Sequence, residues 1–171
     1  MKISVITVSL NSEKTIEKTI NSVLSQNYTD LEYIIIDGKS TDKTLEVIEK
    51  YKSKINIIVS EKDKGIFDAI NKGIQRCSGD IVSIIHSDDF FYNDKVLDVV
   101  NKNFTENDDL ECLIGTTLIK RKNSNFTVRK YNSLFFKKWM IYLGFTPPHP
   151  STFIKKKVYD KIGFYKTNYE I

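Results

Sequence analysis

Cysteine, proline and glycine are all scarce in this chain. Its 171 residues include 2 Cys, 3 Pro and 7 Gly, and no tract is of low complexity. Cys77 and Cys112 stand alone among apolar residues, so we expect reduced, buried thiols and neither a disulfide framework nor a metal site. The composition is that of a globular cytosolic protein, and the length predicts one domain, residues 1–171.

Long apolar runs are also missing. No stretch reaches the roughly 20 residues of a membrane-spanning helix. The apolar start, Ile3 to Leu10, lacks the charged leader and cleavage site of a signal peptide and instead predicts a strand. The net charge of +4 is small and spread along the chain, and residues 137–138 and 155–157 form only small basic clusters. We therefore expect no nucleic-acid partner and a cytoplasmic location.

Short β-branched runs alternate with helical patterns over the first hundred residues. Strands are expected at Ile3–Ser9, Leu31–Ile36, Ile55–Ser60 and Ile81–Ile85. Apolar residues at helical spacing follow each strand, over 16–24, 45–51, 66–77 and 96–104. Short links between these elements favour right-handed crossovers. The fold class is α/β, with a Rossmann-like, mostly parallel central sheet flanked by helices.

The pattern changes after residue 109. Two successive strands, Glu111–Lys120 and Asn125–Tyr131, joined by a turn at 121–124, indicate antiparallel or mixed pairing. The aromatic, amphipathic stretch Leu134–Phe145 predicts a helix packed against the sheet, and contact with a membrane surface is the alternative. His149 follows two prolines, where it could line a pocket or be structural. A strand at 151–154 and a helix at 158–162 complete the expected elements.

Polar residues follow each of the four early strands. Ser9 and Asn11 close the first, Asp37 the second, residues 61–65 the third, and Asp88-Asp89 the fourth. Parallel strands bring these ends to one edge, where open α/β sheets bind ligands. Two adjacent carboxylates need a compensating cation or hydrogen-bond donors, and a hard divalent metal shared with a diphosphate would supply the cation. The alternative is a solvated turn in which Asp88 or Asp89 caps the following helix. With Asp63, these acids predict a nucleotide and metal crevice.

Most of the candidate residues also have a purely structural interpretation. Asp37 could accept hydrogen bonds from a nucleobase or ribose, or cap the turn that follows it. Lys64 and Gly65, ahead of a helix, could meet a phosphate or form an ordinary loop. Asp68 and Asn71 could orient sugar hydroxyls or belong to a solvated helix face.

Four segments in order resemble the family-2 inverting glycosyltransferases with a GT-A fold. They are ISVITVSLN, YIIIDGKSTDKTL, SEKDKGIFDAINKGI and GDIVSIIHSDDFF, and they cover about the first hundred residues. A weaker likeness continues through PPHPSTFIKKKVYDKIGFY, which looks like the acceptor-side segment of bacterial polysaccharide-assembly members. The resemblance implies a nucleotide-sugar-binding part at 1–106 and the start of an acceptor-side part at 107–171.

The resemblance also implies roles for single residues. Ser87-Asp88-Asp89 matches the family's variant of the DxD motif, so Asp88 would approach the ribose or metal and Asp89 would bind Mn²⁺ or Mg²⁺. Asp37 resembles the acid beside the base, and residues 63–71 resemble the loop and helix lining the nucleotide-sugar. The full set implied for the donor is Ser9, Asn11, Asp37, Lys64, Gly65, Asp68, Asn71 and Asp88.

The implied reaction is metal-dependent transfer from a nucleotide diphosphate-sugar, by default a UDP-sugar, to a hydroxyl. The acceptor would be a glycan or a lipid-linked molecule, with peripheral contact at the inner face of the membrane. Inversion by single displacement needs a general base. In this family it is an Asp in a later motif resembling A-S-D-x-D, so we expect it beyond Ile171, with the present chain truncated and poorly active.

The chain departs from the family at two positions. Leu10 stands where many members have a Tyr beside the nucleobase, so aromatic stacking is lost. His86 stands where close relatives commonly carry Asn, which affects contacts with the donor sugar.

Three other function classes make different demands on the sequence. A sugar-phosphate nucleotidyltransferase would prefer a Gly-rich, basic loop after the first strand, which residues 8–12 lack. A receiver-type signalling domain would carry its acidic pair where Ser9 and Asn11 stand, so it is discounted. A non-catalytic nucleotide-sugar-binding module stays open.

Overall fold

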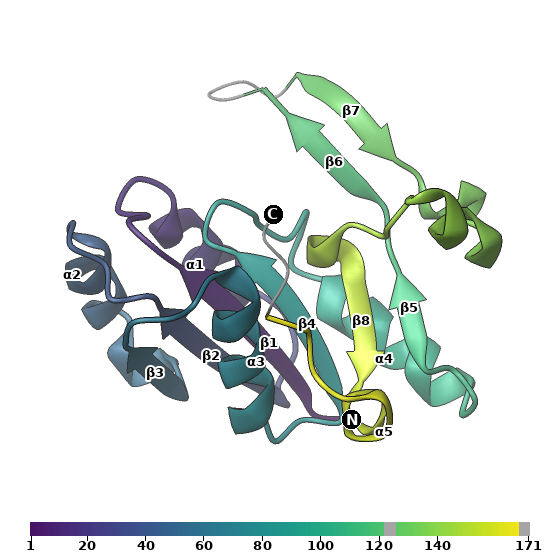
Figure 1. Ribbon diagram of the computed structural model, residues 1–171, viewed down its shortest axis with the longest axis horizontal. Helices are drawn as coiled ribbons and strands as arrows, with labels where there is room; N and C mark the ends of the chain where they lie inside the picture. The colour runs from purple at the N-terminus through teal and green to yellow at the C-terminus, as the bar shows by residue number, and fades with distance from the viewer. Residues whose placement is uncertain (122–125, 168–171) are drawn as a thin grey trace.

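A six-stranded sheet with helices on both faces forms the body of the molecule (Figure 1). The computed structural model describes residues 1–121 and 126–167. The strand order is β3-β2-β1-β4-β8-β5. The first four strands, β1 (Ile3–Ser9), β2 (Leu31–Asp37), β3 (Ile57–Ser60) and β4 (Ile81–His86), are parallel. Strands β8 (Thr152–Lys155) and β5 (Cys112–Ile114) add antiparallel pairs. The expected α/β fold with a mostly parallel sheet is confirmed.

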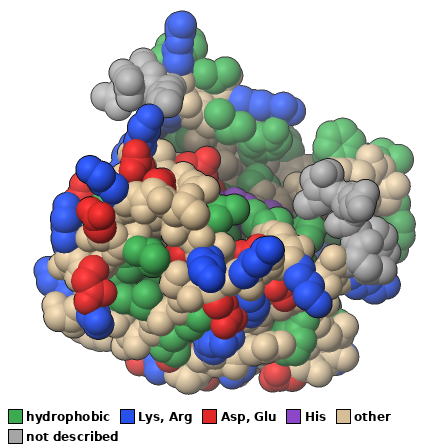
Figure 2. All heavy atoms as spheres, turned by 60° about the vertical axis from the view of Figure 1, so that its left-hand side comes forward, with side chains coloured by type: hydrophobic (Ala, Val, Ile, Leu, Met, Phe, Trp, Pro, Cys, Tyr) green, Lys and Arg blue, Asp and Glu red, His purple; other side chains and the backbone are tan. Residues whose placement is uncertain are grey.

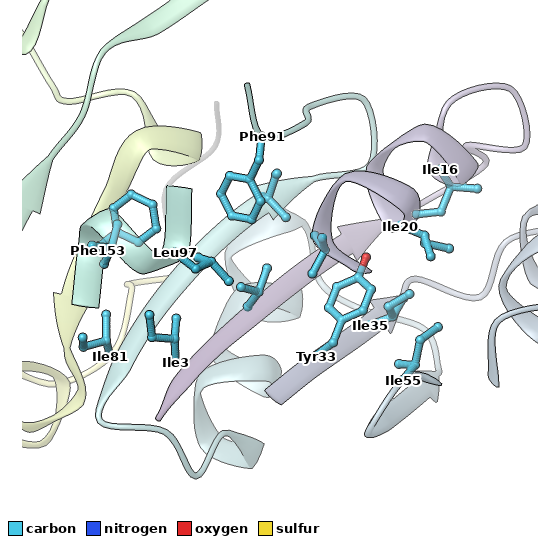
Figure 3. Close-up of a cluster of buried hydrophobic side chains, with 14 of the residues drawn as sticks. Ile3, Ile16, Ile20, Tyr33, Ile35, Ile55, Ile81, Phe91, Leu97 and Phe153 are labelled. Carbon is cyan, nitrogen blue, oxygen red and sulfur yellow. The ribbon is translucent and has the colours of Figure 1, made fainter. Parts of the chain in front are cut away.

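Two separate hydrophobic cores cover the two faces of this sheet. One core joins the sheet to helices α1 (Ile16–Leu24), α2 (Thr44–Glu49) and α4 (Val96–Glu106), and Figure 3 shows its side chains. The other core joins the sheet to α3 (Ile66–Arg76) and α5 (Lys156–Ile162). Alternate residues of each strand supply the two cores, as the pleat requires. Because both faces are buried, β1 and β2 consist almost entirely of buried residues.

Helix α3 lies unusually close to the sheet. A Cβ atom on Gly73 would stand 2.4 Å from Ile6 Cγ2, so the absence of a side chain allows this approach. The N-terminal end of α3 is thereby held beside the carboxyl ends of β1 and β2.

A buried carboxylate stabilises the sheet near the amino ends of its parallel strands. Glu32 is 5% exposed, and its oxygens accept hydrogen bonds from the Ser4 hydroxyl, from the backbone and hydroxyl of Ser78, and from Lys2 Nζ at 3.1 Å. Burial by itself raises the pKa of Glu32, but these hydrogen bonds outweigh it and lower the pKa to about 2. Folding therefore favours the ionised form of this side chain.

We expect Glu32→Gln to lower the free energy of unfolding by about 3 kcal/mol at pH 7, the value of a shift from pKa 4.5 to about 2. Because the folded-state pKa is the lower one, this contribution is complete above pH 4.5 and disappears as the pH falls toward 2. Urea unfolding at several pH values measures it. The exposed Glu46, changed to Gln, is the control. If Glu32→Gln and Glu46→Gln lowered the free energy of unfolding equally at pH 7, the stabilising role of the ionised Glu32 would be contradicted.

The expected strand Glu111–Lys120 is wrong as a single element. It divides into β5 in the main sheet and β6 (Thr117–Lys120), which pairs only with β7 (Thr127–Tyr131) in a hairpin. The chain leaves the sheet at Gly115, whose N–H donates to the Ser151 carbonyl at 2.6 Å. Residues 122–125, most of the expected turn, lie outside the described residues.

The two thiols differ in exposure. Cys77 is buried as expected, but the expectation that Cys112 is buried is wrong. Cys112 begins β5, the outermost strand of the sheet, so its side chain is exposed.

The helix expected over Leu134–Phe145, packed against the sheet, is also wrong. The segment forms two short 3₁₀ turns, η2 (Ser133–Phe135) and η3 (Lys138–Leu143), and most of its large side chains are exposed. Extended backbone at Phe136 and Lys137 separates the turns, and Gly144 ends the second with φ 82°. Bulky apolar residues on all sides leave no single stripe for the sheet to cover.

After these turns the chain returns to the sheet. The 3₁₀ turn η4 (His149–Ser151) precedes β8, near the expected strand, and α5 follows it directly. A further 3₁₀ turn, η1 (Lys52–Lys54), precedes β3. Within 1–121 and 126–167, no helix is both long and apolar enough to cross a membrane.

Candidate functional site

A pocket of about 740 Å³ opens at the carboxyl edge of the parallel strands. Its walls come from the loop after β1, from the loop before α3, and from the end of β4. The Ser12 and Ser87 hydroxyls lie 2.7 Å apart and join the ends of β1 and β4. Figure 2 shows the molecule hollowed below the hairpin, with histidine side chains at the bottom of the hollow. The convergence expected from the sequence is therefore present.

Hydrogen bonds fix the loop after β1 in its conformation. Asn11 has φ 49°, and its amide N–H donates to the Ser40 hydroxyl at 2.8 Å. Its side-chain oxygen accepts from the Thr41 N–H at 2.9 Å. The Ser12 N–H donates to the Thr44 hydroxyl at 2.7 Å. The wall that holds Ser9, Leu10 and Asn11 is consequently tied to the loop after β2.

Asp37 lies behind this wall and is completely buried. Its carboxylate accepts hydrogen bonds from the hydroxyls of Ser9 at 3.2 Å and Ser60 at 2.8 Å. The backbone N–H and the hydroxyl of Ser40 supply two more. Ser9 lines the pocket, whereas Asp37 does not reach it. Asp37 therefore positions the pocket wall through its three serine partners.

Asp63 enters the pocket from the loop after β3. A Cβ atom on Gly38 would lie 2.5 Å from Asp63 Oδ2, so Gly38 leaves room for this carboxylate. The Gly65 N–H donates to Asp63 Oδ1 at 2.9 Å and holds the loop in place. Asp63 and Gly65 both line the pocket.

The other candidates, which lie on α3 or just before it, make contacts within the protein. The Lys64 N–H donates to Asp68 Oδ2 at 3.0 Å, and Lys72 Nζ lies 3.3 Å from the same oxygen. The hydrogen bond from the Lys64 backbone is the largest cause of a lowered pKa of Asp68, and the contact with Lys72 lowers this pKa further. The Asn71 amide pairs with both backbone groups of Tyr165, at 2.7 and 2.9 Å. None of Lys64, Asp68 and Asn71 is among the described residues that line the pocket.

His86, Asp88 and Asp89 form a cluster where β4 ends. One ligand atom of each lies within 4.8 Å of the others, a spacing that suits a metal ion. Burial, and next the charge of Asp88, raise the pKa of Asp89 to about 6. Burial also lowers the pKa of His86, whose Nε2 is buried without a hydrogen-bond partner among the described residues. Two crowded carboxylates beside an uncharged imidazole favour a divalent cation.

Two aromatic residues from the later part of the chain complete this region. The His149 ring lies 5.8 Å from the His86 ring and 6.2 Å from the Tyr165 ring. Tyr165 in turn stacks on Phe67 of α3 at 5.6 Å. From the sequence, His149 could line a pocket or be structural, and no individual role was predicted for Tyr165, the last residue of the acceptor-side segment.

Known proteins are similar to this chain in sequence and in fold. A family model described as Glycosyl transferase family 2 matches residues 4–166. The poly(ribitol-phosphate) beta-N-acetylglucosaminyltransferase TarS of Staphylococcus aureus is 35% identical over 103 residues, which are 57% of this chain and 18% of TarS.

Two solved structures share the fold. That of Staphylococcus aureus TarS 1-349 in complex with UDP-GlcNAc aligns with a TM-score of 0.72 and 27% identity, over 94% of this chain and 47% of that one. The mannosyltransferase PcManGT of Pyrobaculum calidifontis, in complex with GDP-Man and Mn²⁺, has a TM-score of 0.74 and 17% identity, over 98% of this chain and 48% of that one. The chain spans about half or less of these proteins' lengths. It belongs to glycosyl transferase family 2.

Proposed function

We propose that this chain is the donor-binding part of a glycosyltransferase. The enzyme would move a sugar from a nucleotide diphosphate-sugar to a hydroxyl of a glycan or lipid-linked acceptor, with inversion at the anomeric carbon. The observation that carries the proposal is the pocket at the carboxyl edge, with His86, Asp88 and Asp89 at the end of β4. The likeness to TarS, solved with UDP-GlcNAc, supports a UDP-sugar as the donor.

The donor's nucleoside lies against the loop after β1 in this proposal. Ser9 and Asn11 offer hydrogen-bonding groups, and Asp37 holds Ser9 in position. Leu10, 57% exposed and at the pocket wall, gives the base an apolar contact without aromatic stacking. Asp63 adds a carboxylate to the pocket lining, held by the Gly65 N–H.

The diphosphate lies between the start of α3 and the end of β4. Lys64 supplies a cation, and Gly65 precedes the N-terminal end of α3, which favours anions. Asp68 and Asn71 act indirectly, because Asp68 holds the Lys64 backbone and Asn71 holds Tyr165. Asp88, exposed at the rim, faces the ribose or the metal.

Asp89 and Asp88 would hold Mn²⁺ or Mg²⁺, with His86 close enough to contribute. The residues fit a divalent ion because their ligand atoms lie within 4.8 Å of one another, and because burial and then the charge of Asp88 raise the pKa of Asp89. An imidazole among the donors favours Mn²⁺ over Mg²⁺. When bound, the ion would neutralise charge on the leaving diphosphate.

The acceptor hydroxyl approaches from the side of His149 and β8, on the acceptor-side part of the chain. It attacks the anomeric carbon as the bond to the diphosphate breaks, and it must lose a proton to a base. We assign that base to none of the residues in 1–121 and 126–167. We propose instead an Asp of a later motif, beyond Ile171. The enzyme would work on the cytoplasmic side of the membrane.

Calorimetric titration of UDP, GDP and ADP, with Mn²⁺ and with EDTA, tests the donor site. We expect UDP to bind with Mn²⁺ and at least tenfold more weakly in EDTA. Tighter binding of GDP or ADP would reassign the donor class. If no nucleotide bound with Mn²⁺ present, the assignment of the pocket would be overturned.

A further inference from the structure

The turns η2 and η3 carry a large exposed apolar surface. Leu134 is 82% exposed, Phe135 74%, Trp139 60%, Tyr142 91% and Leu143 65%. Soluble monomers rarely leave so many large apolar side chains together in water, and such patches mark interaction sites. Among the described residues, the hydrogen bonds of this segment stay within 132–145, so the body of the protein holds it only loosely.

Basic residues surround these side chains, and acidic residues are missing from the whole region. No Asp or Glu occurs between Glu111 and Asp160, a stretch with ten Lys and Arg. The rest of the chain has 16 Lys and Arg against 22 Asp and Glu. The expectation of an evenly spread charge is therefore wrong, because the small net charge hides a strongly basic region. Arg129, Lys130, Lys137 and Lys138 are all exposed there.

We propose that η2, η3 and β7 form a docking surface for a lipid bilayer with anionic headgroups. Aromatic and aliphatic side chains with lysines beside them suit the boundary between headgroups and acyl chains. Each Lys or Arg near an anionic surface adds to the attraction, while its aliphatic stem lies among the apolar groups. A second copy of the chain fits this surface poorly, because two basic surfaces would face each other.

The hairpin that carries β7 stands at the same edge of the sheet as the pocket (Figure 1). The hairpin β6–β7 rises from the edge of the sheet at which β4 ends, and the turns follow β7 (Figure 1). Thr117 at the base of β6 donates to the Ser151 hydroxyl at 2.7 Å, and His149 lies against His86. A docked bilayer would present headgroups on the acceptor side of the pocket. This link to the acceptor rests on the proposed function, whereas binding to the bilayer does not.

Sedimentation with vesicles tests the proposal directly. We expect the protein to bind vesicles of phosphatidylglycerol and phosphatidylcholine, and to bind pure phosphatidylcholine at least tenfold more weakly. Raising the salt concentration should release it. Trp139 is the sole Trp, so its fluorescence should shift to the blue on binding and be quenched by brominated lipid.

Two double variants separate charge from apolar contact. Lys137→Glu with Lys138→Glu, and Trp139→Ser with Tyr142→Ser, should each weaken vesicle binding at least tenfold. Lys50→Glu with Lys54→Glu makes the same charge change on an exposed part of the body and should leave it unchanged. UDP titration of each variant reports separately on the donor site.

Three results would overturn the proposal. The first is that the protein does not bind anionic vesicles. The second is that the Lys137→Glu with Lys138→Glu variant and the Trp139→Ser with Tyr142→Ser variant bind vesicles as tightly as the unsubstituted protein does. The third is a dimer in analytical ultracentrifugation that Trp139→Ser with Tyr142→Ser converts to a monomer, since a second copy would then cover the surface.

Discussion

Replacing Asp89 by Asn should weaken Mn²⁺-dependent nucleotide binding by at least a hundredfold, about 3 kcal/mol. The reason is local charge, because Asp89 is the partly buried carboxylate of the cluster, whereas Asp88 is exposed. No salt bridge joins its carboxylate to a Lys, Arg or His within residues 1–121 and 126–167, and burial with the charge of Asp88 raises its pKa to about 6, so the folded protein disfavours the charge. Calorimetry with UDP and Mn²⁺ measures the loss.

Stability provides an internal control for this variant. Since Asp89 has a raised pKa, its ionised form above pH 6 is less stable in the folded protein than in the unfolded chain. A neutral Asn should therefore leave the metal-free protein as stable as before, or more so. Asp109→Asn, an equal charge change at an exposed site, should alter neither property. Retention of full Mn²⁺-dependent binding by Asp89→Asn would remove Asp89 from the metal site.

Replacing Asp37 by Ala should lower the free energy of unfolding by about 3 kcal/mol, the largest loss of stability expected at the pocket. The change removes the fully buried acceptor that the hydroxyls of Ser9, Ser40 and Ser60 share, and it leaves the buried Ser9 hydroxyl without that partner. Urea denaturation measures the effect. Asp37→Asn, which keeps an acceptor oxygen, should lose less than Asp37→Ala.

The same change should also weaken UDP binding, because Ser9 and the loop after β2 lose their fixed positions. The exposed Asp30, changed to Ala, is the matched control and should lose less than about 0.5 kcal/mol. A loss below 1 kcal/mol for Asp37→Ala would show that the serines find other partners.

The local sequence pattern was sufficient to predict the half of the fold that contains the parallel strands. The runs at β1, β2 and β4 are β-branched and buried on both faces, so their length and composition identify them. Their parallel pairing then brings Ser9 beside Asp37 in register and Val8 beside His86. The pocket follows from this geometry, and the acidic pair could be located from sequence because it directly follows a recognisable strand.

The local sequence pattern gave wrong or missing predictions where contacts with distant residues decide the structure. Gly115 breaks a strand because its neighbour Ser151 comes from a distant segment, which no local signal reveals. The 3₁₀ turns replace a helix because the sheet offers no surface to cover the aromatic side chains of 134–145. Tyr165 reaches the region of His149 only because Asn71 holds its backbone, a contact between residues 94 positions apart. Each case depends on a partner far away in the chain.

The separation of the β6–β7 hairpin from the main sheet has a consequence for motion. Backbone amides of β1 and β2, shielded on both faces, can exchange with solvent hydrogen only when the whole sheet opens. Every residue of β7 is exposed, and β6 and β7 form a two-stranded sheet that no other described strand joins, so the hairpin can open while the main sheet stays intact. The main sheet around the pocket is thus rigid, whereas the β6–β7 hairpin can change shape without loosening that sheet.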